Sequence, residues 1–212
     1  MAIRNLLFDL GGVVVDIRRR NCVEAFERLG LPDADAHFGE YAQTGIFMAL
    51  EDGSASVDEF HAALRQEFPN PEDISDAQID DAFQKFIIGI PEERLRALVE
   101  LRKRYRIYLL SNTNPIMWDG VLAREFDKLP PRRRADYFDG MVTSFEACAA
   151  KPDAAIFRYA ERELGIRPEE TLFFDDSQAN VDAARALGFH AELVPPGTEF
   201  TDVLKSFEAA RK

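Results

Sequence analysis

The spacing of apolar residues changes twice along the chain and divides it into three parts. The chain opens with a short apolar run, residues 3–8, which is too short for a stable helix and suits a strand buried in a parallel sheet. From about residue 18 to 88 the apolar residues recur at helical spacing, and no segment there is a convincing strand. After Pro91, short apolar runs alternate with helical patterns of about ten residues.

The middle part is predicted to be a small bundle of helices. Two segments, 57–68 and 79–87, carry clear apolar stripes, and each follows a capping box, which satisfies free N–H groups at the start of a helix. The boxes are formed by Ser56 with Glu59 and by Ser75 with Gln78. Weaker patterns predict two more helices, over about 19–29 and 34–50.

The last part is predicted to form most of a sheet. Four further strands are expected, at residues 106–110, 140–144, 171–174 and 189–194. A helical pattern comes before the first of them, and others lie between them. Alternating strands and helices form a parallel sheet covered on both faces, and the first strand must join that sheet. The fold class is therefore α/β, with a core made of residues 1–16 and 90–212 and an inserted all-helical cap, residues 17–89.

Composition and charge narrow the possible functions. A chain of 212 residues with 46% hydrophobic residues can form one core with a smaller insertion. The net charge of -12 argues against general affinity for nucleic acid or for anionic membranes. The beginning lacks the features of a signal peptide, and no apolar run approaches the ~18 residues of a membrane span, so a cytoplasmic location is expected. Cys22 and Cys148 are far apart, and no disulfide is expected in that compartment.

Polar residues follow the expected strands at the points where they end. In such sheets, ligands bind at the carboxyl ends of the strands, so these residues should meet at one edge. They include carboxylates, a hydroxyl, amides and one lysine: Asp9, Gly11 and Gly12; Ser111 and Asn112; Glu146 and Lys151; Asp175, Asp176 and Asn180.

This set suits phosphoryl transfer. A carboxylate can take up a phosphoryl group as an aspartyl-phosphate, but two anions approach each other only if a cation screens them. Mg²⁺ prefers oxygen ligands, which Asp9 and Asp176 can supply, and a lysine adds a fixed positive charge for the phosphate oxygens. No GxxxxGK[ST] motif is present, so the chain is not a P-loop protein.

Four motifs, FDLGGVVVD, LLSNTN, AKPD and FFDDSQANV, resemble those of the haloacid dehalogenase (HAD) superfamily of phosphohydrolases. The resemblance covers essentially the whole chain. It implies a Rossmann-like HAD core with a helical cap of the C1 type, and Mg²⁺-dependent hydrolysis of a small phosphorylated metabolite, such as a sugar phosphate. The sequence is most similar to the branch that acts on α-glucose 1-phosphate.

The resemblance also implies a role for each motif residue. Asp9 would be the nucleophile and a Mg²⁺ ligand, together with the backbone carbonyl of Gly11 and with Asp176. Asp175 would lie nearby, acting through water or a hydrogen bond. Lys151 would neutralise the phosphoryl group and the nucleophile, and the remaining phosphate contacts would come from Ser111 and Asn112.

Gly11 departs from the family pattern, because most phosphatases of the superfamily carry an aspartate there as general acid and base. Its loss predicts slower turnover or a preference for good leaving groups, such as a sugar 1-phosphate. Asp16 is the nearest replacement carboxylate, but it is expected to begin the linker to the cap. Two alternatives remain: a metal-independent dehalogenase, which would not need the Asp175–Asp176 pair, and a degenerate phosphate-binding or regulatory protein.

The cap should set the choice of substrate, since it closes over the site. Four residues are candidates for the pocket, with a structural role as the default for each: Tyr41, Phe47, Glu51 and Trp118. The run 132–134 of three arginines is expected to be a solvated turn or a second anion contact. The chain is expected to be a monomer or a weak dimer.

Overall fold

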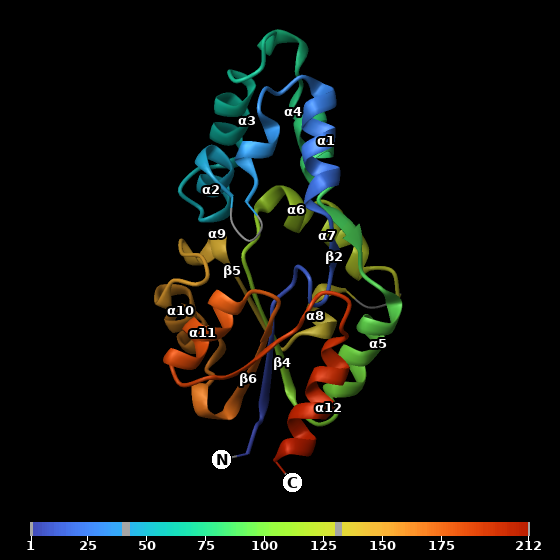
Figure 1. Cartoon of the computed structure of the whole chain (residues 1–212), viewed down its shortest axis with the longest axis vertical. Coiled ribbons are helices and arrows are strands. Elements are labelled where there is room, and N and C mark those ends of the chain that lie inside the picture. Colours follow the sequence, from blue (N-terminus) through green and yellow to red (C-terminus); the bar gives the residue numbers. More distant parts are fainter. Residues whose placement is uncertain (1, 40–42, 130–132, 212) are drawn as a thin grey trace.

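A five-stranded sheet lies at the centre of the computed structural model, which describes residues 2–39, 43–129 and 133–211 (Figure 1). All its neighbouring strands are parallel, in the order β5-β4-β1-β6-β7. The strands are β1 (Asn5–Phe8), β4 (Arg106–Ser111), β5 (Gly140–Thr143), β6 (Thr171–Asp175) and β7 (His190–Leu193). The predicted α/β class and the placement of the first strand inside this sheet are confirmed.

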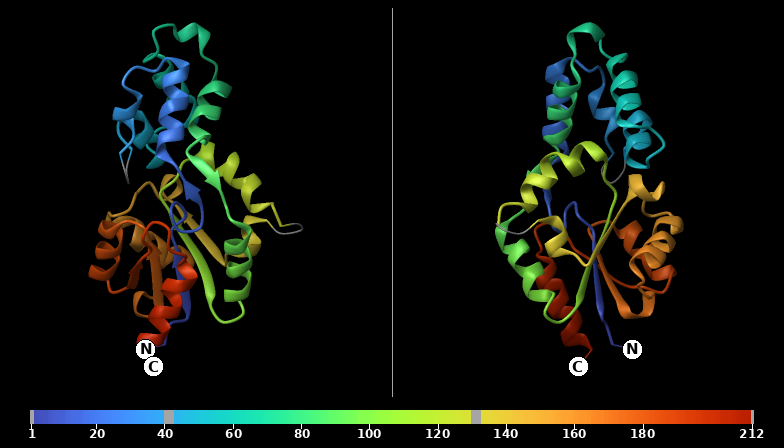
Figure 2. Two further views of the ribbon diagram at one scale, coloured as in Figure 1. Left: turned by 45° about the vertical axis from the view of Figure 1, so that its right-hand side comes forward. Right: turned by 180° about the vertical axis from the view of Figure 1, so that it is seen from behind.

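Helices cover both faces of the sheet (Figure 2). One face packs on α10 (Ala154–Leu164) and α11 (Gln178–Ala186), through side chains such as Leu7 and Phe173. The opposite face, with Leu6 and Phe8, packs on α5 (Glu92–Leu101) and α12 (Phe200–Ala210). This sidedness follows from the alternation of side chains along a strand. The remaining core elements are α6 (Pro115–Asp119), α7 (Val121–Phe126), α8 (Arg134–Tyr137), α9 (Ser144–Ala147) and η3 (Pro168–Glu170).

A group of helices lies beyond the carboxyl ends of the strands, at the top of Figure 1. It contains α1 (Arg19–Leu29), η1 (Ala34–His37), α2 (Gly45–Glu51), α3 (Val57–Arg65), η2 (Pro71–Asp73) and α4 (Asp76–Gln84). Its centre is a cluster of aromatic rings: Phe26, Phe38, Phe47, Phe60 and Phe83. Both predicted capping boxes are present, at the starts of α3 and α4.

Three details of the sequence prediction need correction. The region 34–50 is not one helix, because the chain forms η1 and then α2, with Gly45 at a positive φ of 58° as the first residue of α2. Helix α4 ends at Gln84, and the apolar residues after it enter a strand, β3 (Ile87–Gly89). β3 pairs antiparallel with β2 (Asp16–Ile17), so the middle region does contain a strand.

The β2–β3 pair lies where the two predicted domain boundaries meet, and the exact division into residues 17–89 and the rest stays a prediction. Arg94 holds β2 near the core, since its guanidinium donates to Asp16 at 2.8 Å and to Glu199 at 2.8 Å. Across the described ranges, the structure contains no helix that is both long and apolar enough to cross a membrane.

Candidate active site

Asp9 and Lys151 meet at the carboxyl edge of the sheet. Asp9 follows β1 directly, and its backbone N–H donates to the carbonyl of Phe174 on β6 at 2.8 Å, which fixes its position between strands. The Lys151 ammonium lies 2.7 Å from Asp9 Oδ1 and 2.7 Å from Asp175 Oδ2. All three residues are at least nine-tenths buried, so these ion pairs are sheltered from solvent screening.

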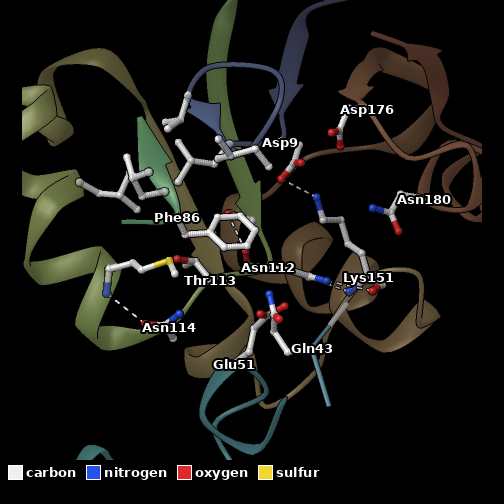
Figure 3. Close-up of a pocket in the computed structure, with 18 residues that line it drawn as sticks. Asp9, Gln43, Glu51, Phe86, Asn112, Thr113, Asn114, Lys151, Asp176 and Asn180 are labelled. Carbon is white, nitrogen blue, oxygen red and sulfur yellow. Dashed lines mark hydrogen bonds and ion pairs between the residues drawn. The ribbon is translucent and has the colours of Figure 1, made fainter. Parts of the chain in front are cut away.

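The Asp175 carboxylate is held by three contacts, and Asp176 points into the pocket (Figure 3). Asp175 Oδ1 accepts from the Ser177 N–H at 2.8 Å and from Asn180 Nδ2 at 3.0 Å, and Oδ2 accepts from Lys151. Gly12 adopts a positive φ of 72°, and a Cβ there would overlap the Asp176 carboxylate. Glycine is therefore required at this position for the backbone to approach Asp176.

The carboxylates at this edge outnumber the positive charges. Oxygens of Asp9, Asp175 and Asp176 lie within 4.8 Å of one another, with Lys151 as the cation between them. Burial raises the pKa of Asp9 to about 8, against the lowering effect of Lys151, and the two neighbouring carboxylates add to the rise. Burial disfavours the charged form of Lys151, but Asp175 and Asp9 outweigh it and raise its pKa to about 12. Excess buried negative charge on oxygen donors is the environment that fits Mg²⁺.

Ser111 and Asn112 follow β4 and lie in the same pocket, but their side chains differ in what they bind. Ser111 is 1% exposed, and its hydroxyl donates to the Asn112 carbonyl over a long distance, 3.3 Å. The Asn112 amide instead holds the backbone of Lys151: Nδ2 donates to the Lys151 carbonyl at 3.0 Å, and Oδ1 accepts from its N–H at 2.8 Å. Asn112 thus positions Lys151 through its side chain.

Gly11 occupies the position at which most phosphatases of the superfamily that the sequence resembles carry an aspartate as general acid, so this chain has no carboxylate there. A Cβ there would meet only the Ile17 side chain, at 3.4 Å, so the backbone does not itself demand glycine. Asp16, the replacement considered from the sequence, pairs with Arg94 and does not line the pocket. The missing proton donor must therefore be sought elsewhere.

One pocket is lined by every residue that was predicted to contact the metal or the phosphoryl group, except Asp175. Asp175 pairs with Lys151 but does not line the pocket. The pocket encloses ≈ 100 Å³ and is lined from the core by Asp9, Gly11, Ser111, Asn112, Lys151 and Asp176, among others. From the cap and its linkers, its wall includes Gln43, Glu51 and Phe86 (Figure 3). The sequence analysis missed Gln43 and Phe86, because no periodicity or motif marks a residue that reaches the site only through docking of the cap.

The other candidates have structural places. Phe47 belongs to the aromatic cluster of the cap and is fully buried there. Trp118 is covered by the Arg134 guanidinium, which lies 3.9 Å from the centre of the indole ring. Phe47 and Trp118 are not among the residues that line the pocket. Tyr41 and Arg132 lie outside the described residues. His61 is buried and bonds Asp80 at 2.7 Å, and Cys22 is buried while Cys148 is exposed, both as free thiols.

The sequence model of the haloacid dehalogenase-like hydrolases matches residues 3–188. The chain belongs to this family. D-ribitol-5-phosphate phosphatase of Bacteroides thetaiotaomicron is 37% identical over 202 residues, which are 95% of this chain and 97% of that protein. Glyceraldehyde 3-phosphate phosphatase of Pyrococcus abyssi is 28% identical over 187 residues, 82% of this chain and 73% of that protein.

A solved structure is similar over nearly the whole chain. A HAD family enzyme from Bacteroides thetaiotaomicron, in complex with magnesium and inorganic phosphate, has a TM-score of 0.88 and 36% identity, covering 95% of this chain and 99% of that one. The predicted superfamily is thereby confirmed, and the chain is a hydrolase of this family. The narrower resemblance to α-glucose 1-phosphate phosphatases stays a prediction.

Proposed function

We propose that this HAD hydrolase is a Mg²⁺-dependent phosphatase that acts on a small phosphorylated sugar or polyol through an aspartyl-phosphate at Asp9. The observation that carries the proposal is the arrangement of the buried Asp9 and Lys151 and the half-buried Asp176 around one pocket. A bound Mg²⁺, held by Asp9, the Gly11 carbonyl and Asp176, would supply the positive charge that lets a phosphate dianion approach a carboxylate.

Residues of the chain itself provide the nucleophile, the charge neutralisation and the phosphate contacts. Asp9 attacks phosphorus, and Lys151 balances the negative charge of both the nucleophile and the phosphoryl oxygens. The Ser111 hydroxyl makes a long bond, 3.3 Å, to the Asn112 carbonyl and can donate to a phosphoryl oxygen instead. Asn112 keeps the Lys151 backbone in place, and Asp175 holds the Lys151 ammonium together with Asp9.

The names of the two relatives support a substrate class. Both act on phosphates of primary alcohols on short carbon chains, D-ribitol 5-phosphate and glyceraldehyde 3-phosphate. The pocket is walled by the cap as well as by the core, which suits a small metabolite. Among the described residues, no hydrogen-bond partner reaches the buried Gln43 Oε1 in the pocket wall, which suits the recognition of a substrate hydroxyl.

Activity toward p-nitrophenyl phosphate should require a divalent metal. We expect turnover with Mg²⁺ and at least a 10²-fold loss after treatment with EDTA, because the cluster of carboxylates then repels the substrate dianion. Release of p-nitrophenol, measured before and after addition of excess Mg²⁺ to the chelated enzyme, checks this. Full activity in EDTA would favour a metal-independent hydrolase of the dehalogenase type, and no activity at all would favour the phosphate-binding alternative.

Phosphates of primary alcohols should be better substrates than anomeric phosphates. We expect kcat/KM for D-ribitol 5-phosphate to exceed that for α-glucose 1-phosphate by about 10-fold or more, equivalent to about 1.4 kcal/mol, because both relatives act on phosphates of primary alcohols. Phosphate release from both compounds and from glucose 6-phosphate measures the difference. A clear preference for the 1-phosphate would instead support the good-leaving-group argument from Gly11.

The cytoplasm and a monomer or weak dimer remain our predictions for location and assembly. The two free thiols are compatible with a reducing compartment.

A further inference from the structure

One acidic side chain enters the pocket from the cap. Glu51 is the last residue of α2, is 9% exposed, and lines the pocket together with Asp9 and Asp176. Unlike those two, it stands outside the cluster of three carboxylates. Within the described parts of the chain, no hydrogen bond or ion pair engages its carboxylate, so a buried carboxyl faces the substrate space with its bonding capacity unused.

The core fixes the end of α2 where Glu51 leaves it. The Ser144 hydroxyl donates to the Glu51 carbonyl at 2.6 Å. The Ser144 Oγ also accepts a hydrogen bond from the Thr113 N–H at 3.0 Å. Thr113 follows β4, the strand next to β1, and Ser144 follows β5, the strand beyond β4. The backbone of Glu51 is therefore hydrogen-bonded to the catalytic edge of the sheet, although Glu51 itself belongs to the cap.

Glu51 lies across the pocket from Asp9, with Lys151 at one side (Figure 3). In phosphoryl transfer the attacking and leaving oxygens stand roughly in line on opposite sides of phosphorus. A phosphoryl group attacked by Asp9 would thus turn its leaving oxygen toward the wall that carries Glu51.

Resting on the proposed phosphatase function, we propose that Glu51 is the general acid and base of the reaction and replaces the carboxylate that is missing at Gly11. In the first step the Asp9 carboxylate oxygen bonds to phosphorus, the bond from phosphorus to the leaving oxygen breaks, and the Glu51 carboxyl gives its proton to that oxygen. In the second step the Glu51 carboxylate takes a proton from water, the water oxygen bonds to phosphorus, and the bond to Asp9 breaks. Phosphate leaves, and Glu51 ends protonated as it began.

The electrostatics of Glu51 suit both steps. Burial raises the pKa of Glu51 to about 7, against the lowering effect of Lys151, and Asp52 adds to the rise. A group with a pKa near the working pH exchanges its proton readily in both directions. Asp9 and Asp176 face it across the pocket. On the helices that pack against α2, the ionisable side chains are exposed or bonded elsewhere: Asp58, Glu59, His61 and Arg65 of α3, and Glu146 of α9.

Two aryl phosphates that carry no extra hydroxyl groups test this role. In Glu51→Gln, kcat/KM for phenyl phosphate should fall by about 10²–10⁴-fold, because its leaving phenolate needs a proton. For p-nitrophenyl phosphate, whose leaving group is far more acidic, the change should stay within about 3-fold. Glu51→Asp should give an intermediate loss with phenyl phosphate, since it keeps the carboxyl on a shorter side chain. In the wild type, kcat/KM for phenyl phosphate should decline above pH of about 7, and this decline should vanish in Glu51→Gln.

Asp16→Asn is the matched control, because it removes the other carboxylate considered for this role and that carboxylate lies outside the pocket. An equal loss for both aryl phosphates in Glu51→Gln would overturn the proposal, as would selective loss for phenyl phosphate in Asp16→Asn. The proposed function is tested separately, since Mg²⁺-dependent turnover of p-nitrophenyl phosphate by the wild type supports it whatever Glu51→Gln does.

Discussion

Asp9→Asn is expected to lower kcat by about 10⁴-fold or more, as the loss of a nucleophile does in other hydrolases. The amide is too weak a nucleophile to displace an alkoxide, and it is a poorer metal ligand than a carboxylate. The fold should survive, because the amide matches the carboxylate in size and keeps a hydrogen-bond acceptor for the Lys151 ammonium, 2.7 Å away in the wild type. Burial and the neighbouring carboxylates raise the pKa of Asp9, so a neutral side chain also relieves repulsion in metal-free protein.

Three measurements check this expectation. Steady-state assays give the loss in kcat, and mass spectrometry of acid-quenched enzyme should find a phosphorylated wild type but no phosphorylated Asp9→Asn. The melting temperature in EDTA should not be lower in the variant. Asp182→Asn serves as the control, because it removes an exposed carboxylate on α11 and should alter none of the three. Substantial turnover by Asp9→Asn would show that another group attacks phosphorus.

The elements that position the site could be predicted because their signals are local. Residues 3–8 read as a buried strand from their apolar run alone, and the capping boxes at Ser56 and Ser75 marked two helix starts. The carboxyl ends of neighbouring parallel strands share one edge, so Asp9 and Lys151 could be placed together although 142 positions separate them in the sequence.

The rest of the site depends on how the cap meets the core, and no local pattern encodes that. Glu51 was one of several equal candidates in the sequence, and the bond from Ser144 to its carbonyl is what places it at the pocket. Phe86 continues the apolar stripe of α4, which favours a helix at this position. The helix nevertheless ends at Gln84, and Phe86 lines the pocket. Pairing of β3 with β2 overrides the local preference there.

Lys151→Met is expected to lower kcat/KM by about 10³-fold, at the upper end of what one lost stabilising donor costs. Lys151 is 5% exposed and lies between Asp9 and Asp175, so its removal also leaves two buried carboxylates without their shared cation. We therefore expect the free energy of unfolding at pH 8, in EDTA, to fall by about 3–5 kcal/mol. Urea denaturation measures that change, and Lys205→Met, which removes an exposed lysine paired only with Asp202, should leave both activity and stability unchanged.

The stability loss in Lys151→Met should shrink as the pH is lowered. Lys151 now lowers the pKa of Asp9, so without it the pKa of Asp9 rises further above the value of 3.8 for an ordinary aspartate. A carboxyl with a raised pKa in the folded state binds its proton more tightly there than in the unfolded chain, so stability decreases as pH rises between the two values. Because the folded pKa of Asp9 is already about 8 in the wild type, both proteins lose stability alike up to that pH, and only the variant continues to lose it above. The lysine itself adds no pH dependence between pH 6 and 9, because its pKa in the folded protein is about 12. If the difference between wild type and Lys151→Met is as large at pH 6 as at pH 9, the raised pKa of Asp9 is not the source of the instability.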